Sequence, residues 1–238
     1  MVPAKTVARP RGLRGLLDAV LDLVYPPRCA ACGEGADGAF CATCAEAIEA
    51  VPPGCGRCGQ PGPDPTCGAC LSHPPAFERV RAGGLLGGPL ADAIHAFKYG
   101  RRPALARPLG AWLAARVSLP PAAVIVSVPL GRARRIARGY DQASLLADAL
   151  AREAGAGGRR LRGVLRRIRE TPPQVGQGRA ERARNVAGAF VASAAAAGRD
   201  LVLVDDVVTT GATADAAAAA LRQAGARSVL VLALARAE

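Results

Sequence analysis

The chain has 238 residues, of which 50% are hydrophobic and 21% charged, a composition typical of a folded globular protein that buries a sizeable core. No run of about 18 uncharged apolar residues occurs, and Asp18 and Asp22 interrupt the apolar segment near the start, so we expect neither a membrane span nor a secretion signal and predict a cytoplasmic protein. The formal net charge of +12 favours phosphate-rich partners, although charge alone is weak evidence for nucleic-acid binding.

Residues 1–28 combine a basic lead with an amphipathic segment. Six apolar residues fall on one face of a predicted helix: Leu13, Leu16, Leu17, Val20, Leu21 and Val24. Pro26 and Pro27 end this helix. The upstream arginines leave two interpretations open, a helix that contacts a membrane surface or a partner and a helix that packs on its own domain, and we favour the second.

All eight cysteines lie between residues 29 and 70, in four C-x-x-C pairs. Cys55 follows Cys29 by 26 residues, and each half of the segment holds two pairs separated by eight residues, so the segment is an internal repeat. A C-x-x-C turn brings two thiolates to one tetrahedral ion, and a site with four thiolates has no open position for catalysis. We therefore predict two structural zinc ions rather than disulfides, held by Cys29, Cys32, Cys41, Cys44, Cys55, Cys58, Cys67 and Cys70. Each copy is expected to hold its own ion, although pairing between copies stays open.

The remaining residues, 73–238, alternate between strand and helix patterns. Predicted strands cover residues 79–86, 123–128, 189–192, 201–204 and 228–233. Predicted helices cover residues 89–99, 103–117, 142–154 and 214–224. This alternation predicts an α/β fold with a parallel sheet flanked by helices. We thus expect three parts: an N-terminal helix (1–28), a double zinc-ribbon domain (29–72) and an α/β domain (73–238).

Phe97, Lys98 and Tyr99 end the first helix of the α/β part, next to Arg101 and Arg102. A lysine between aromatic residues and beside two arginines can face a phosphate or a base. A lysine whose aliphatic stem covers apolar surface at a helix end is equally consistent with this pattern. The two interpretations of Lys98 stay open.

Pro129 and Gly131 break the strand that ends near Val128, and four arginines follow: Arg132, Arg134, Arg135 and Arg138. Ligands of open α/β sheets bind beyond the carboxyl ends of the strands. If this strand neighbours residues 201–204, the arginines lie where a polyphosphate would bind. The alternative is a solvated basic surface.

Residues 159–185 carry nine arginines against two acids, with Pro172, Pro173 and a polar run after them. A packed element is not expected over much of this segment. Long loops of this kind in compact domains often serve as lids over a site. A basic insertion that contacts nucleic acid is the alternative.

Residues 201–204 form an apolar run typical of a buried strand, and Asp205 and Asp206 follow directly. A turn of small residues, 209–213, then opens an Ala-rich helix and offers free backbone N–H groups to an anion. Two acids after a strand also occur in Walker-type nucleotide sites, but the G-x-x-x-x-G-K-[ST] motif of those sites occurs nowhere in the sequence. The pattern predicts a phosphate site at the carboxyl end of this strand.

The run VLVDDVVTTGAT, residues 202–213, resembles the signature with which type I phosphoribosyltransferases hold phosphoribosyl pyrophosphate (PRPP). The resemblance implies that Asp205 and Asp206 contact the ribose hydroxyls. It also implies a 5′-phosphate cradle formed by Thr209, Thr210, Gly211, Ala212 and Thr213. Carboxylates favour the positive charge that develops on the sugar, while Mg²⁺ bound with PRPP and arginines neutralise the departing pyrophosphate.

The whole chain resembles the competence protein F (ComF) family. The shared motifs are, in chain order, Pro26-Pro27-Arg28-Cys29, Phe97-Lys98-Tyr99, Val128-Pro129-Leu130, Arg138-Gly139-Tyr140-Asp141-Gln142, Thr171 with Gln174, Arg182 with Asn185, and Phe190. The likeness implies a type I phosphoribosyltransferase fold behind the double zinc ribbon. It assigns the pyrophosphate side to Val128, Pro129, Leu130, Gly131, Arg132 and Arg138, and a mobile catalytic loop to residues 169–185 with Gln174, Arg182 and Asn185.

The sequence departs from the usual family pattern at three places. Ser127 stands where the family usually has Pro, Tyr140-Asp141 where it has Phe-Asn, and Gln177 where it has Leu. Asp141 matters most, because a negative charge beside a pyrophosphate site weakens anion binding unless Mg²⁺ or an arginine offsets it.

Two functions follow from the resemblance. In the first, the protein binds PRPP or a related phosphoribosyl ligand and acts in DNA uptake and natural transformation. Its partners would be single-stranded DNA and helicase and recombination-mediator proteins, and it would work in the cytoplasm at the inner face of the membrane with peripheral membrane contact. In the second, it is an active phosphoribosyltransferase that transfers ribose 5-phosphate to a nucleobase or another acceptor, in nucleotide salvage. No segment of the sequence identifies the acceptor.

Overall fold

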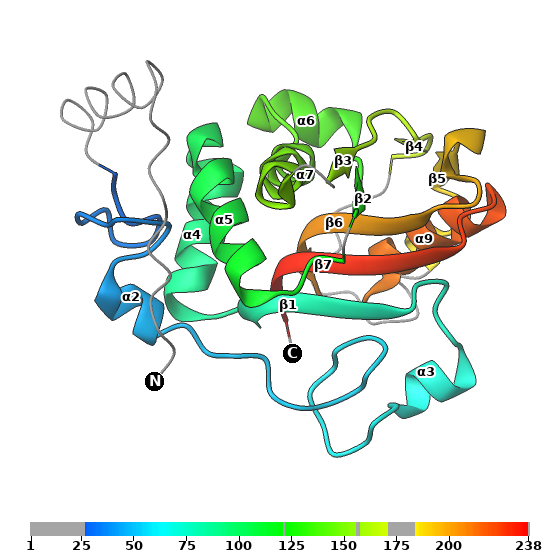
Figure 1. Cartoon of the computed structure of the whole chain (residues 1–238), viewed down its shortest axis with the longest axis horizontal. Coiled ribbons are helices and arrows are strands. Elements are labelled where there is room, and N and C mark those ends of the chain that lie inside the picture. The colour runs from blue at the N-terminus through cyan, green and yellow to red at the C-terminus, as the bar shows by residue number, and fades with distance from the viewer. Residues whose placement is uncertain (1–26, 121, 156–157, 171–183, 238) are drawn as a thin grey trace.

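The computed structural model describes residues 27–120, 122–155, 158–170 and 184–237 (Figure 1). The helix predicted within residues 1–28 therefore lies almost wholly outside the described residues, as do Gln174, Arg182 and the departure at Gln177.

A five-stranded parallel sheet forms the centre of the molecule, with strand order β1-β7-β6-β2-β3. The strands are β1 (Arg79–Leu85), β2 (Val124–Ser127), β3 (Arg159–Arg160), β6 (Asp200–Val208) and β7 (Ser228–Arg236). The register pairs Val124 with Leu201 and Ser127 with Val204. The strand before the arginines thus neighbours the strand before the two acids, and the predicted α/β fold with a parallel sheet is confirmed.

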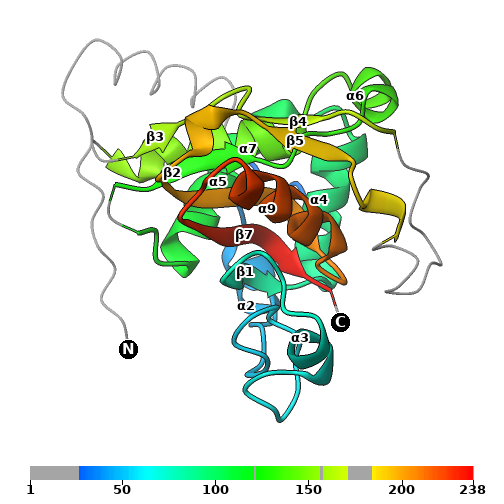
Figure 2. The same ribbon diagram turned by 90° about the vertical axis from the view of Figure 1, so that its right-hand side faces the viewer.

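Helices cover both faces of the sheet (Figures 1 and 2). The first face carries α4 (Gly88–Tyr99), α5 (Ala106–Arg116) and α7 (Gln142–Glu153), with the short η1 (Pro103–Leu105) before α5. The second face carries α9 (Ala212–Gln223) and a separate antiparallel pair, β4 (Leu165–Arg167) with β5 (Phe190–Ala192), followed by η3 (Ala194–Ala196). A further helix, α6 (Arg132–Arg138), lies between β2 and α7.

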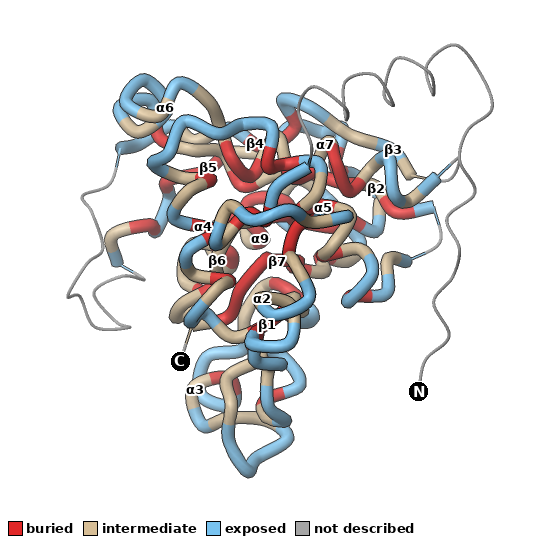
Figure 3. Tube along the Cα trace, turned by 90° about the vertical axis from the view of Figure 1, so that its left-hand side faces the viewer, coloured by how far each residue is buried: buried red, intermediate tan, exposed pale blue. Residues whose placement is uncertain are grey.

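Alternation along the strands divides the core in two. Along β6, Val202 and Val204 pack among α4, α5 and α7, whereas Leu201 and Leu203 pack against α9. Successive strand side chains point to opposite faces, and a strand covered on both faces is apolar throughout. The continuous apolar runs in the sequence therefore reflect two buried faces (Figure 3).

The two cysteine repeats sit on different sides of this arrangement. The first copy includes α2 (Ala42–Glu46) and packs on the first face, where the rings of Phe40 and Trp112 lie 5.3 Å apart in an edge-on arrangement. The second copy includes α3 (Gly68–Ser72) and contributes Cys55, Cys58 and Cys70 to the core of the second face. Figure 1 shows α2 near α4 and α3 beyond the other end of β1.

Strand β1 is an edge strand, and the cysteine repeats cover part of its outer edge. The N–H of Val80 donates to the carbonyl of Arg57 (2.7 Å), and the N–H of Leu85 donates to the carbonyl of Glu49 (2.9 Å). Backbone groups that would otherwise face solvent are thus paired with the segment that holds the cysteines.

Candidate phosphoribosyl site

Asp205 and Asp206 lie at the carboxyl end of β6, as the sequence predicts. Lys98, at the end of α4, forms an ion pair with Asp206 (Nζ to Oδ1, 2.8 Å), and the N–H of Asp206 donates to Oδ1 of Asp205 (2.8 Å). Burial and the neighbouring Asp206 charge raise the pKa of Asp205, and the Asp206 N–H and Lys98 only partly offset this. Of the two interpretations of Lys98, the structure thus favours a lysine that faces the site, here paired with an acid.

The turn after β6 leads directly into the N-terminus of α9. Gly211 precedes the helix with φ +82, a left-handed conformation in which a side chain would be strained. The N–H of Ala212 approaches Oγ1 of Thr210 at 3.4 Å, and Asp215 in the first turn of α9 accepts the N–H of Ala76 (2.7 Å). Twelve residues of helix follow, so the turn combines N–H groups with the positive end of a helix dipole.

The loop after β2 is held by Asp141. Its carboxylate accepts the N–H of Leu130 (2.9 Å) and the N–H of Ser144 (3.0 Å). Through the second bond Asp141 caps the N-terminus of α7. Two backbone N–H donors therefore stabilise the negative charge of this carboxylate. Nearby, Glu170 accepts the N–H of Arg132, so one carboxylate already occupies the loop where an anion was expected.

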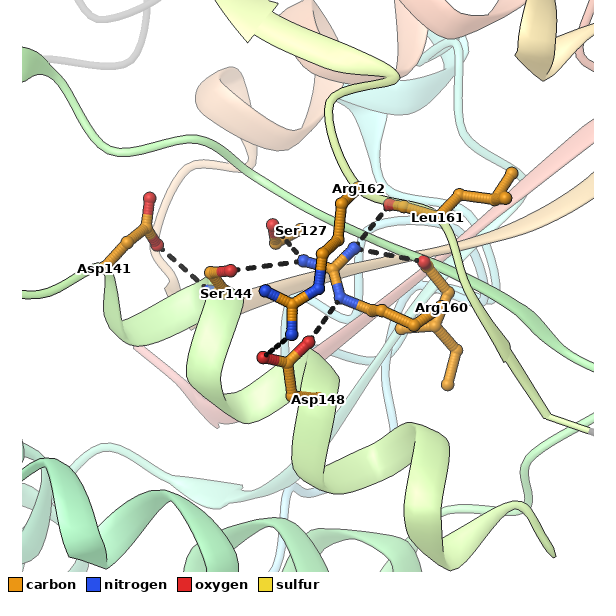
Figure 4. A network of polar contacts seen from close by, with 8 residues as sticks. Ser127, Asp141, Ser144, Asp148, Arg160, Leu161 and Arg162 are labelled. Atoms are coloured by element: carbon orange, nitrogen blue, oxygen red, sulfur yellow. Dashed lines mark hydrogen bonds and ion pairs between the residues drawn. The ribbon is translucent and has the colours of Figure 1, made fainter.

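Arg160 of β3 supports this loop from the side of α7 (Figure 4). Its guanidinium donates to Asp148 (3.0 Å), and to the hydroxyls of Ser127 (2.9 Å) and Ser144 (3.3 Å). Burial lowers the pKa of Arg160, and the Asp148 carboxylate offsets part of that shift. Ser127, which departs from the family pattern, thus offers Arg160 a hydroxyl acceptor that a proline side chain lacks.

A cavity of about 480 Å³ brings these parts together. Its lining includes eleven residues that the sequence singles out as candidates for the site: Lys98, Val128, Pro129, Leu130, Arg134, Arg138, Asp141, Asp205, Asp206, Thr209 and Thr213. Gly131, Arg132, Thr210, Gly211 and Ala212 belong to the same two loops but do not line the cavity. Asn185 lies elsewhere, where its carbonyl accepts a hydrogen bond from Arg169 (2.9 Å).

Two other lining residues, Arg167 and Gln142, were not assigned to the site from the sequence. Arg167 reaches the cavity from β4, and its pKa is lowered by burial and by nearby Arg134, which also lines the cavity. Gln142 is 1% exposed; its Oε1 accepts from Arg138 (3.0 Å), and its Nε2 has no hydrogen-bond partner among the described residues. The motif around Gln142 was the only signal for it, and β4 gave none because three residues carry no periodicity.

The cysteines form two clusters, Cys29/Cys32/Cys41/Cys44 and Cys55/Cys58/Cys67/Cys70, within which the sulfur atoms all lie within 4.8 Å of one another. Ligands thus pair within each copy of the repeat. Burial raises the pKa of Cys29, but the backbone N–H groups of Cys32, Cys41 and Ala31 lower it further, to about 6. Cys55, its equivalent, behaves alike, with a pKa of about 6. Four converging sulfur ligands fit a tetrahedral zinc ion, so these are two structural zinc sites.

Known proteins resemble the cysteine-rich segment by itself and also most of the chain. A family model described as a double zinc ribbon domain matches residues 20–71. The DNA utilization protein YhgH of Salmonella typhi is 35% identical over 82% of this chain and 89% of its own length. YhgH of Escherichia coli K12 is 35% identical over 71% of this chain and 77% of its own, and competence protein F of Haemophilus influenzae is 33% identical over 72% and 78%.

A search of solved structures found the glutamine PRPP amidotransferase of B. subtilis, complexed with ADP and GMP. It is 24% identical, with a TM-score of 0.38, over 60% of this chain and 27% of that chain. Within the described residues, no helix has the length and apolar character needed to cross a membrane.

Proposed function

The chain belongs to the family of DNA utilization protein YhgH and competence protein F, and from this premise we propose that it binds PRPP or a related phosphoribosyl ligand while serving the uptake and use of DNA. Single-stranded DNA is the proposed nucleic-acid partner. Helicase and recombination-mediator partners, and contact with the inner face of the membrane, are parts of the same proposal.

One observation carries the ligand proposal: the acid pair, Thr209 and Thr213 of the following turn, and the loop after β2, which is far from them in sequence, line one cavity. Asp205 and Asp206 would hold the ribose hydroxyls, the N–H groups of residues 209–213 would hold the 5′-phosphate, and the loop at Val128 would face pyrophosphate. Mg²⁺ bound with PRPP would neutralise the pyrophosphate, and carboxylate oxygens suit its ligand preference.

Thermal melting tests this proposal directly. At PRPP a hundredfold above its dissociation constant, with Mg²⁺, the melting temperature is expected to rise by roughly 5 to 10 °C. Asp205→Asn and Asp206→Asn should each reduce this rise. Asp200→Asn is the matched control, because Asp200 lies at the amino end of the same strand, paired with Arg227. If PRPP leaves the melting temperature of the wild-type protein unchanged, the proposed PRPP site is refuted.

The basic rim of the cavity supports the DNA proposal. Arg132 and Arg135 are exposed on α6, and Arg138 stacks over the 60% exposed ring of Tyr99 at 4.8 Å. Cations that follow a phosphate backbone, with an aromatic ring on which a base stacks, are what single-strand binding needs. Affinity for an oligonucleotide should fall steeply with salt, and an affinity that does not change with salt would exclude phosphate contacts.

An active phosphoribosyltransferase is the second candidate. It is favoured by the apolar side of the cavity, where Leu86, Ala91 and Ile94 line the same space as the acid pair, in a volume that suits a small ligand. Release of pyrophosphate across a panel of nucleobases and other acceptors would identify a transferase. Binding of PRPP without release for any acceptor would leave the binding role alone.

A further inference from the structure

Arg236, the last residue of β7, is 1% exposed and is among the largest fully buried side chains. Its Nε donates to the carbonyl of Cys58 (3.2 Å) and its Nη2 to Oε1 of Gln60 (2.7 Å). Its Nη1 donates to the carbonyls of Val208 (3.1 Å) and Thr209. One guanidinium therefore joins two regions far apart in sequence.

The two regions have different chemistry. Cys58 is a ligand of the second zinc site, and Gln60 lies directly after the tight turn at Gly59 (φ +67). Val208 ends β6, and Thr209 is the first residue of the turn proposed to hold the 5′-phosphate. A guanidinium has five donors in a rigid fork, so a shift on one side is transmitted to the other.

We propose that Arg236 is a positioning residue that couples the second zinc site to the phosphate turn, so that zinc at Cys55, Cys58, Cys67 and Cys70 raises affinity for the phosphoribosyl ligand. The inference rests on the proposed function of that turn. Zinc fixes the thiolate of Cys58 and with it the carbonyl that Arg236 uses. Without zinc the knuckle relaxes, Arg236 loses acceptors on that side, and the carbonyl of Thr209 loses a fixed donor.

The first zinc site is placed differently. Its copy of the repeat packs Phe40 on Trp112 at the first face of the sheet, and the carbonyl of Glu49 accepts the N–H of Leu85 at the edge of β1. The contacts of that copy described above reach α5 and β1, at the far side of the sheet from α9. Its zinc should therefore support folding without setting the turn.

The internal repeat provides a matched test. Cys41 and Cys67 are the third cysteines of their copies, so Cys41→Ser and Cys67→Ser remove equivalent ligands. With zinc content measured for each variant, Cys67→Ser is expected to weaken PRPP binding about tenfold, while Cys41→Ser stays within about twofold of wild type. Equal weakening in both variants would overturn the coupling.

Linkage gives a second readout that simple loss of structure would not produce. If zinc favours PRPP, PRPP must favour zinc by the same factor. In full-length protein, PRPP with Mg²⁺ should slow zinc transfer to a chromogenic chelator from the second site alone. Arg236→Lys keeps the positive charge with fewer donors, and it should retain two zinc ions yet lose this protection.

The outcomes separate the inference from the function on which it rests. Wild-type protein that fails to bind PRPP refutes the proposed function. Wild-type protein that binds PRPP, with zinc release slowed equally at both sites or with Arg236→Lys still protected, refutes the coupling while the function stands. If Cys67→Ser does not fold, the comparison of Arg236→Lys with wild type decides the matter.

Discussion

Asp205 lies beside a second carboxylate at the end of β6, and burial together with Asp206 raises its pKa. The carboxyl of Asp205 therefore binds its proton more tightly in the native state than in the unfolded chain. Stability is expected to fall as pH rises from about 4, the unfolded value, toward the raised pKa. Asp205→Asn keeps an oxygen for the N–H of Asp206 and removes this loss.

The expected result is a variant more stable than wild type at pH 8, by on the order of 1 kcal/mol, with the difference vanishing near pH 4. Urea unfolding across this range measures it. Asp200 has the opposite sign, because Arg227 and Ser228 lower its pKa to about 2. Asp200→Asn should therefore lose stability at neutral pH. An Asp205→Asn variant less stable than wild type at pH 8 would contradict the assignment.

Residues of the site were predictable where they are contiguous in sequence. Asp205, Asp206 and the following turn form one local pattern, because a strand end and a helix start meet within a few residues. Arg167 and the Lys98 to Asp206 ion pair depend on contacts between distant segments, so no local pattern announces them. Asp141 shows the same limit: its charge was visible in the sequence, but its two backbone donors were not.

At the scale of elements, β3 has only two residues and depends on side-chain contacts to hold its place at the sheet edge. Arg160 and Arg162 both pair with Asp148, with side-chain exposures of 12% and 69%. Arg160→Met is expected to cost about 3 kcal/mol, because buried partners lose their donor. Arg162→Met should cost less than about 1 kcal/mol.

Urea unfolding of the two variants provides the comparison, because each variant removes one positive charge that pairs with Asp148. Equal costs would mean that the buried network contributes nothing beyond a surface ion pair. A larger loss of PRPP affinity in Arg160→Met would further indicate that the network positions the loop after β2, since Ser127 and Ser144 are its other partners.

The elements that the sequence failed to predict are short or lack an apolar face. Helix α6 buries none of its residues and consists largely of arginine, so its sequence resembles a basic loop. In the structure the helix ends at Gly139, which has φ +82. By contrast, α9 was expected from its alanines, of which Ala214, Ala217 and Ala218 pack on the sheet. Burial produces the periodicity on which sequence interpretation depends.

Considered as a whole, the molecule has one zinc site beside each of its two cores. Removal of zinc by a strong chelator is therefore expected to destabilise the entire chain, by roughly 5 kcal/mol or more, rather than to melt the ribbons alone. Trp112, the only tryptophan, packs on Phe40 of the first copy and reports on that side.

Calorimetry and Trp112 fluorescence should then change together, in one transition at a lower temperature. Metal analysis before and after chelation provides the control, with two zinc ions expected per native chain. A chelated chain that melts at the wild-type temperature would show that the cysteine repeats fold on their own account and contribute little to the cores.

The pairing of Val80 with Arg57 and of Leu85 with Glu49 has a consequence for solubility. A bare edge strand is a template for a strand of another molecule, and β1 has only two charged residues, Arg79 and Arg81, along an otherwise open edge. While zinc holds the knuckles in place, their backbone occupies that edge. Loss of metal in the cell would thus uncover an edge that recruits further copies, so aggregation rather than simple inactivity is the expected fate of zinc-starved protein.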